Sequence, residues 1–252
     1  MMNILTKWLT SQSKDHNKKI KRLPSRSLFY RTIFLSGRYK GMKNEQANLL
    51  KGYNLLLYFG GSMIMSEPTD ECVIDFWANG SLNKLPIKSA NPRFLMAASL
   101  LRDSCHDKVT CKSLLSSDYR KLLDLAANPM APAVASAYMK IGAGSNDITS
   151  EISSFYKTYG WEPNKALVPA DHLGIELLFL TKLVDKYLVL DDAPCINEMK
   201  NEIVRFIDRF LLPWLPEWTE KMNALSASDS FRGISILIYA CIEDIRGMMI
   251  PA

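Results

Sequence analysis

The sequence contains none of the short motifs that mark the common enzyme classes. It has no Gly-x-x-x-x-Gly-Lys-Ser/Thr loop for binding phosphates and no Gly-x-Ser-x-Gly turn for presenting a nucleophilic serine. Gly142, Gly144 and Gly160 do not form a dinucleotide-binding fingerprint, because no predicted strand precedes them. We therefore predict that the chain is not an enzyme and that it holds no cofactor.

Histidine and cysteine are too few and too scattered for a conventional metal site. The chain has three histidines and five cysteines, and no two cysteines have the Cys-x-x-Cys spacing of a structural zinc site. The closest group is Cys105, His106 and Cys111. We predict no metal, and we expect these cysteines to be reduced thiols in the core or in a loop, as is usual in the cytosol.

Long apolar runs are also missing. No stretch reaches the ~20 apolar residues that a transmembrane helix needs. Near the N-terminus, the apolar residues Ile4, Leu5, Trp8 and Leu9 are interrupted by Lys7 and followed by a basic run, which is unlike a secretory signal. These features predict a cytoplasmic protein.

The net charge of +5 is distributed unevenly along the chain. Residues 1–43 contain eleven Lys or Arg and one acid, which gives +10, whereas the rest holds 20 Lys or Arg and 25 Asp or Glu, which gives −5. We interpret residues 1–44 as a basic N-terminal extension that could bind nucleic acid or an anionic membrane, stay solvated, or fold back on the acidic body. No basic groove with interleaved aromatic residues accompanies it, so we expect no nucleic-acid partner.

The body of the chain is predicted to be all-α. Apolar residues recur at intervals of three and four, and the alternating apolar and polar runs that indicate strands are absent. We expect Gly60-Gly61 to end the first helix and Ser117-Asp118 to cap the fourth. About ten helices are predicted: Glu45–Phe59, one between Pro68 and Asn79, Phe94–Leu101, Tyr119–Ala127, Val134–Ile141, Ser150–Tyr159, Pro169–Leu190, Ile196–Leu212, Trp218–Leu225 and Phe231–Met249.

We expect these helices to form a globular bundle in two subdomains. Residues 45–142 are the predicted N-terminal helical subdomain and residues 169–252 the C-terminal one. The stretch 143–168 between them contains Gly160 and Pro163, and we interpret it as a hinge or linker.

A group of polar residues opens the most apolar helix, predicted over Pro169–Leu190. Pro169 suits a first helical position, and Asp171 then falls in the first turn, where the helix dipole favours a carboxylate. His172 and Glu176 are four residues apart, so they share one face, and His172 is expected to stay neutral near a helix N-terminus. Buried polar groups cost stability unless they are satisfied, which makes this group a candidate site. The alternative is that each residue only satisfies the helix or a neighbour.

The residues around this helix start resemble a known family. The run Pro169-Ala170-Asp171-His172 followed by Glu176-Leu177 is similar to the Pro-x-Asp-His…Glu-Leu signature of the TorD-type redox enzyme maturation chaperones, a family with TorD-, DmsD- and NarJ-like members. Val168 stands where many members carry Glu. The resemblance implies an all-helical, cytoplasmic protein. It covers roughly residues 45–252 and includes Asp118–Leu123, Tyr156–Gly160, Phe210–Leu215 and Phe231–Ile234.

The resemblance also implies a partner. Proteins of this family bind the twin-arginine signal peptide and the apo body of a molybdopterin oxidoreductase during its maturation. Asp171, His172 and Glu176 would then receive the two guanidinium groups, and the apolar part of the peptide would lie in a groove between helices. Further residues predicted at this site are Pro169, Trp161, Leu167 and Leu173, with an acidic rim of Asp185, Asp191 and Asp192.

Two further expectations concern GTP and assembly. The resemblance implies weak GTP binding, and a hinge between subdomains allows a domain-swapped dimer as well as a monomer. The alternative function is a helical adaptor whose basic arm, residues 1–44, binds nucleic acid or an anionic membrane. Only that alternative predicts binding that falls steeply with salt.

Overall fold

The structure is a computed structural model that describes residues 44–70, 87, 89–105, 107–139, 147–163 and 168–250. The basic extension and nearly all of the helix predicted after Pro68 lie outside these residues. Gly41–Ala252 forms one compact unit. The predicted division of this unit into two subdomains at 143–168 stays a prediction.

All regular structure within the described ranges is helical, which confirms the all-α prediction. The one β-bridge in them pairs Val134 with His172. No helix in this part of the chain is long and apolar enough to span a membrane. The α-helices are α3 (Asn44–Met65), α5 (Pro92–Asp103), α6 (Lys108–Leu122), α7 (Ile148–Thr158), α8 (Leu173–Val189), α9 (Ala193–Phe206), α10 (Leu215–Leu225) and α11 (Asp229–Met249); the 3-10 turns are η4 (Leu125–Ala127) and η5 (Ala135–Ala137), and η6 (Ile207–Leu211) is a π-helix.

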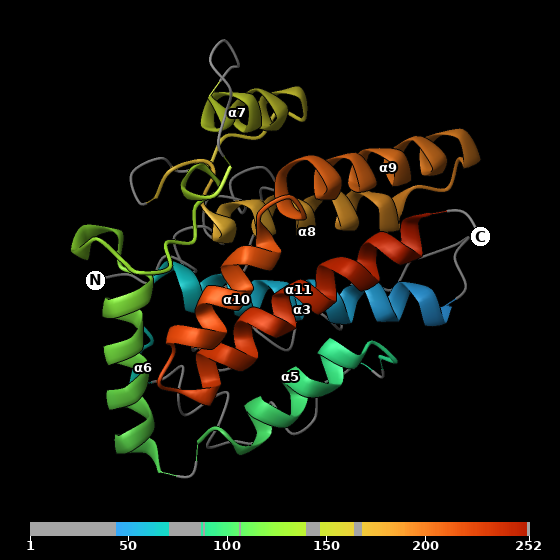
Figure 1. Cartoon of the computed structure of the whole chain (residues 1–252). Coiled ribbons are helices and arrows are strands. Elements are labelled where there is room, and N and C mark those ends of the chain that lie inside the picture. Colours follow the sequence, from blue (N-terminus) through green and yellow to red (C-terminus); the bar gives the residue numbers. More distant parts are fainter. Residues whose placement is uncertain are drawn as a thin grey trace, which may run out of the picture. The chain divides into compact units, whose positions relative to one another are not determined.

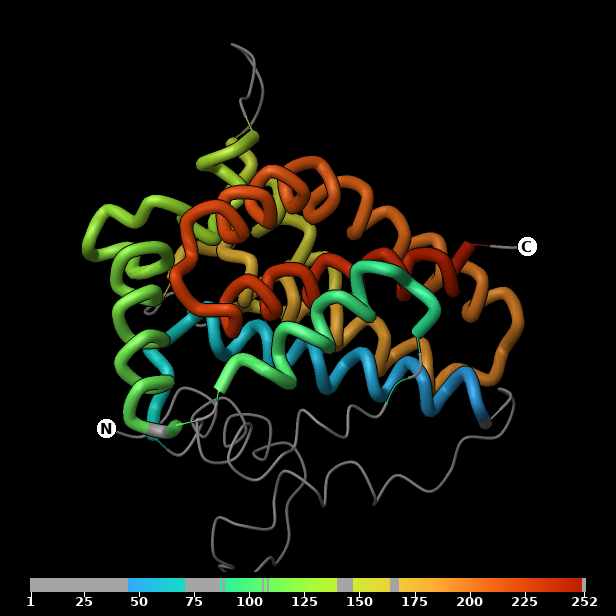
Figure 2. Tube along the Cα trace, turned by 60° about the horizontal axis from the view of Figure 1, so that its bottom comes forward, coloured from blue at the N-terminus to red at the C-terminus, as the bar shows by residue number. Residues whose placement is uncertain are grey.

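The core lies between the long helices. The apolar helix α8 packs against α3 on one side and α9 on the other, and α11 packs against α3, α5 and α10 (Figure 1). Figure 2 shows α3, α5 and α11 along their lengths from another side. Twelve of the 17 residues of α8 are buried. They include the first five, Leu173 to Leu177, so the side chains at the start of this helix are shielded from water.

The first helix does not end at its glycine pair, which corrects the predicted end at Phe59. Gly60 and Gly61 lie inside α3. A Cβ at Gly60 would lie 2.7 Å from Ile238 Cγ1 of α11, and Gly61 faces Gly174 of α8. These glycines allow the helices to approach closely, and they do not terminate α3.

The helix predicted over Tyr119–Ala127 is also wrong at both ends. The structure has α6 from Lys108, where Asp107 accepts a bond from Thr110 N, to Leu122. Asp118, predicted as a cap of that helix, lies inside it and is buried. Its carboxylate instead accepts bonds from Ala227 N, Ser228 N and Ser228 Oγ, just before α11.

Other predicted helices also differ from the structure, and the one predicted from Trp218 begins at Leu215, as α10. The sequence predicts a helix over Val134–Ile141, but Val134 forms the β-bridge and η5 follows it. The helix predicted over Ile196–Leu212 begins earlier, at Ala193, and its last turn widens into η6. Trp214 Nε1 donates to the carbonyl of Phe210 at 2.7 Å, which satisfies one carbonyl of this wider turn.

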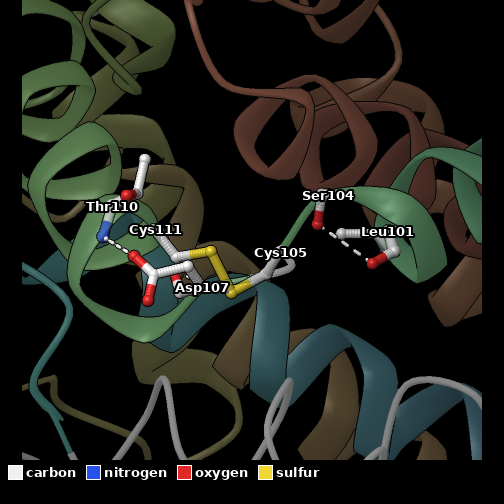
Figure 3. The surroundings of a disulfide bond; sticks show 6 residues. All are labelled: Leu101, Ser104, Cys105, Asp107, Thr110 and Cys111. Atoms are coloured by element: carbon white, nitrogen blue, oxygen red, sulfur yellow. Dashed lines mark hydrogen bonds between the residues drawn. A yellow bond between two sulfur atoms is a disulfide. The ribbon is translucent and has the colours of Figure 1, made fainter.

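The connection between α5 and α6 contains a disulfide, which corrects the expectation of reduced thiols. Cys105 and Cys111 are bonded, with their Cα atoms 5.6 Å apart (Figure 3). Cys105 follows α5 and Cys111 lies in the first turn of α6, so the bond fixes the entry into α6. Cys241 is a buried free thiol and Cys195 an exposed one.

Candidate functional site

Ala170 and Asp171 form a turn and His172 is extended, so the helix begins at Leu173 and not at Pro169. Ala135 N donates to Asp171 O and Leu173 N donates to Ala133 O, which forms the short antiparallel contact around Val134. Because these groups bond across to another segment, Asp171 precedes the helix instead of lying in its first turn. This corrects the predicted helix start while keeping its polar residues together.

His172 caps α8 with its side chain. Its Nδ1 accepts a bond from Gly174 N at 3.1 Å, so the neutral ring carries its proton on Nε2. Burial lowers the pKa of His172 to about 4, and the opposing effect of Asp171 is smaller. The imidazole is therefore neutral at pH 7. The prediction of a neutral ring agrees with this direction, but burial causes it and not the helix dipole.

Glu176 is the most unusual group of the site. Its side chain is fully buried, and neither carboxyl oxygen has a hydrogen-bond partner among the described residues. Burial raises the pKa of Glu176 well above its ordinary value, and the nearby Asp171 raises it further. The protonated, neutral form is favoured, because an ionised carboxylate without partners is costly away from water.

Asp171 is the second acid of the cluster. Its carboxylate is 1% exposed, and Oδ2 accepts a bond from Ser136 N at 2.9 Å. Its other oxygen, Oδ1, lacks a partner within the described part of the chain. Asp171 influences the pKa of both His172 and Glu176, which shows that the three groups lie close together. We call Asp171, His172 and Glu176 the acid–imidazole cluster.

Tyr156 of helix α7 lies next to this cluster. Tyr156, which is completely buried, donates its hydroxyl to Ala170 O at 3.0 Å. Burial raises the pKa of Tyr156 well above its usual value, and Glu176 and then Asp171 add to the rise. Trp161 packs edge-on against Tyr156, with ring centres 4.8 Å apart. Aromatic side chains therefore pack beside the predicted site.

The structure brings only part of the predicted site together. Leu173 is buried in the core, while Trp161 is half-buried and Pro169 is exposed. The predicted rim lies at the other end of α8, which is about 25 Å long. There Asp185 accepts a bond from Asn54 at 2.9 Å, Asp192 caps α9 through Cys195 N, and Asp191 is exposed. Leu167 lies outside the described residues.

Burial limits what the cluster can do in this arrangement. Asp171, His172 and Glu176 are each at most 1% exposed, so a guanidinium group cannot reach them without a movement of their cover. Tyr156 and Ser136 are the partners that sequence reasoning missed. The apolar spacing of Ile152, Tyr156 and Tyr159 predicts a helix, but it carries no signal of what that helix covers. In the described residues, no group of three or more His, Cys, Asp or Glu could hold a metal ion.

Comparison with known proteins decides the family. The family model described as "Nitrate reductase delta subunit", which represents TorD- and NarJ-type proteins, matches residues 90–220 and so just over half of the chain. The chain belongs to the TorD-type chaperone family. The matched TorD-family region includes η5, α7 and the start of α8, and therefore the whole acid–imidazole cluster.

Curated relatives carry the same family name. The chain is 28% identical over 141 residues to the chaperone protein TorD of Vibrio vulnificus strain YJ016, and 27% identical over 141 residues to that of strain CMCP6. Each alignment covers 55% of this chain and 66% of the relative. The chain thus spans slightly less than two thirds of the length of the TorD relatives it matches. GTP binding and assembly state stay predictions.

Proposed function

We propose that this protein is a cytoplasmic maturation chaperone that binds the twin-arginine signal peptide, and the apo body, of a molybdopterin oxidoreductase. Membership of the TorD-type family supports the class of partner. The single observation that carries the site is the acid–imidazole cluster at the start of α8. Glu176 there is completely buried and both of its oxygens lack partners among the described residues.

The chemistry of the cluster matches the ligand. A guanidinium group donates several N–H bonds in a plane, and a carboxylate accepts two of them side by side. Glu176 and the free oxygen of Asp171 have that acceptor capacity to spare. Each charge-assisted bond contributes about 1.5–3 kcal/mol. A bound guanidinium would also stabilise the ionised form of Glu176, so binding would release a proton from this side chain.

The direct test is calorimetry with a twin-arginine peptide. Glu176→Gln keeps the shape and the neutral state of the side chain but cannot become an anion. We therefore expect at least a tenfold loss of affinity in Glu176→Gln and in Asp171→Asn. The thermal midpoint of Glu176→Gln should not fall, so its loss of affinity would not come from unfolding. Replacing both peptide arginines by lysine should also weaken binding, because an ammonium group cannot bond in the bidentate way.

The control is the same change on an exposed acid. Glu198 is exposed on α9 and lies outside the proposed site, so Glu198→Gln should leave the affinity unchanged. Asp191→Asn tests the proposed rim separately. If the peptide binds all of these variants as it binds the unaltered protein, the acid–imidazole cluster is not its site. If the peptide binds none of them, including the unaltered protein, the proposed function fails.

A further inference from the structure

Helix α7 lies at the edge of the helical body, beside the start of α8 (Figure 1). Ile148, Ile152 and Tyr156 of α7 are buried, and Phe155 and the C-cap residue Tyr159 are half-buried. Four of these inward residues are Ile152, Phe155, Tyr156 and Tyr159. They recur at positions i, i+3, i+4 and i+7 from Ile152, which is the anchor pattern of a helix that lies in a groove. Helix α7 thus packs on the rest of the protein in the way that a bound helical peptide packs in a groove.

The surface beneath α7 is aromatic. Phe179 of α8, Phe206 of α9 and Phe210 of η6 are all at most 2% exposed. The ring of Phe155 lies 5.8, 5.5 and 5.3 Å from these three rings, and Tyr156 lies 4.7 Å from Phe179. We call Phe179, Phe206 and Phe210 the aromatic floor. It extends from the acid–imidazole cluster, because Tyr156 contacts both.

The outer edge of α7 carries polar contacts with α9 and η6. Glu151 accepts two bonds from Arg209, at 2.8 and 2.6 Å, and both side chains remain partly exposed to water. Tyr159 donates its hydroxyl to Glu202, and Arg205 lies over the ring of Phe155 at 4.9 Å. Exposed ion pairs contribute little to stability, so the Glu151–Arg209 pair positions α7 without fixing it strongly.

The closed position of α7 also carries an unfavourable free energy, because polar atoms of the acid–imidazole cluster are buried without partners in the part of the chain that the structure describes. While α7 is in place, both oxygens of Glu176 and one oxygen of Asp171 are shielded from water and have no partner in the described residues. Lifting α7 would return these groups to water or to a ligand. The resulting solvation offsets part of the unfavourable exposure of Phe155 and Tyr156 when they leave the floor.

We infer that α7 is a displaceable cover, and that the surface beneath it, the acid–imidazole cluster together with the aromatic floor, is one binding site. Its ligand is a peptide with cationic residues followed by an apolar helix: the cations pair with Asp171 and Glu176, and the apolar helix replaces α7 on the floor. This inference rests on the proposed function and states how the buried site becomes accessible.

Hydrogen exchange tests the cover without any ligand. We expect the amides of α7 to exchange together and at least tenfold faster than those of α8 and α11, because α7 opens as a unit. Glu151→Gln should speed their exchange a further two- to fivefold, the factor equivalent to losing about one exposed ion pair. Glu217→Gln, which removes the exposed pair with Lys221 on α10, should leave α7 unchanged. Exchange of α7 only through global unfolding overturns the inference.

A twin-arginine signal peptide with its apolar segment tests the displacement. Binding should expose the α7 amides to exchange while protecting the floor, and Glu151→Gln should bind about two- to fivefold more tightly. A bound peptide that leaves α7 protected, with equal affinity in both proteins, overturns the inference but leaves the proposed function standing. A peptide that binds neither protein overturns the proposed function and the ligand assigned here, while exchange in the free protein still decides whether α7 opens.

Discussion

Glu176 is a carboxyl group in the interior of the protein. It is fully buried beside Asp171, and its pKa is raised above the ordinary value of 4.5 by burial first and by that neighbour second. In the unfolded chain the same carboxyl ionises near that ordinary value. Folding therefore takes up a proton at Glu176, and stability must depend on pH through this residue.

The sign of this dependence gives the first prediction. Because the folded pKa is the higher one, the contribution of Glu176 is fully present below about pH 4.5 and is lost as pH rises towards the folded pKa. Relative to Glu176→Gln, the unaltered protein should lose stability at up to about 1.4 kcal/mol per pH unit above pH 4.5. Urea unfolding of both proteins from pH 4 to pH 8 measures this difference. Parallel stability curves would show that Glu176 ionises normally.

Gly60 and Gly61 give the second prediction, and each serves as the control for the other. A Cβ at Gly60 would lie 2.7 Å from Ile238, so Gly60→Ala should cost about 1–3 kcal/mol through overpacking. At Gly61 the nearest atoms are 3.7 Å away, an ordinary contact, and alanine is the better helix former. Gly61→Ala should be neutral or stabilise by up to about 1 kcal/mol. Thermal unfolding distinguishes the two, and equal losses would contradict the close approach of α3 and α11.

The start of α11 is held by a side chain from another helix. Asp118 of α6 is buried and binds Ala227 N, Ser228 N and Ser228 Oγ at the start of α11. Its removal leaves buried donors unsatisfied, so Asp118→Ala should cost about 2–3 kcal/mol. Asp107→Ala removes one exposed cap bond of α6 and should cost about 1 kcal/mol. Chemical denaturation compares the two, and a similar cost would mean that the bonds of Asp118 to Ala227 and Ser228 contribute no more than one exposed cap bond.

Helix boundaries are harder to predict than helices, for a physical reason that Asp118 and Gly60 illustrate. The spacing of apolar residues indicates which stretches bury one face, and it predicts the core of α3, α5, α7, α8, α9, α10 and α11. The ends depend on partners distant in sequence. Asp118 follows a serine and precedes a stretch predicted to be helical, as a helix cap does, but it binds residues more than 100 positions away. Gly60 is part of a glycine pair of the kind that ends helices, but its role is to leave space for Ile238.

For the molecule as a whole, the all-α fold and the family can be predicted from the sequence, but the accessibility of the site cannot. The motif around Asp171 and His172 locates the polar cluster along the chain. Whether a neighbouring helix covers that cluster depends on how Tyr156 and Phe155 pack, and spacing within a single helix does not specify a partner. The aromatic floor likewise combines residues from α8, α9 and η6, which only the folded chain brings together.

The Cys105–Cys111 bond gives a prediction for global stability. It closes a loop of seven residues, and a loop of that length restricts the unfolded chain by an amount equivalent to about 2 kcal/mol. Adding a thiol reductant should lower the free energy of unfolding, measured in urea, by about that amount. The double variant Cys105→Ser, Cys111→Ser should be as stable as the reduced protein, and the reductant should not change its stability. Cys195 and Cys241 are free thiols, so they add no reductant effect of their own. A reductant effect that persists in the double variant would place the relevant bond elsewhere, and equal stability with and without reductant would mean that the bond contributes nothing to the folded state.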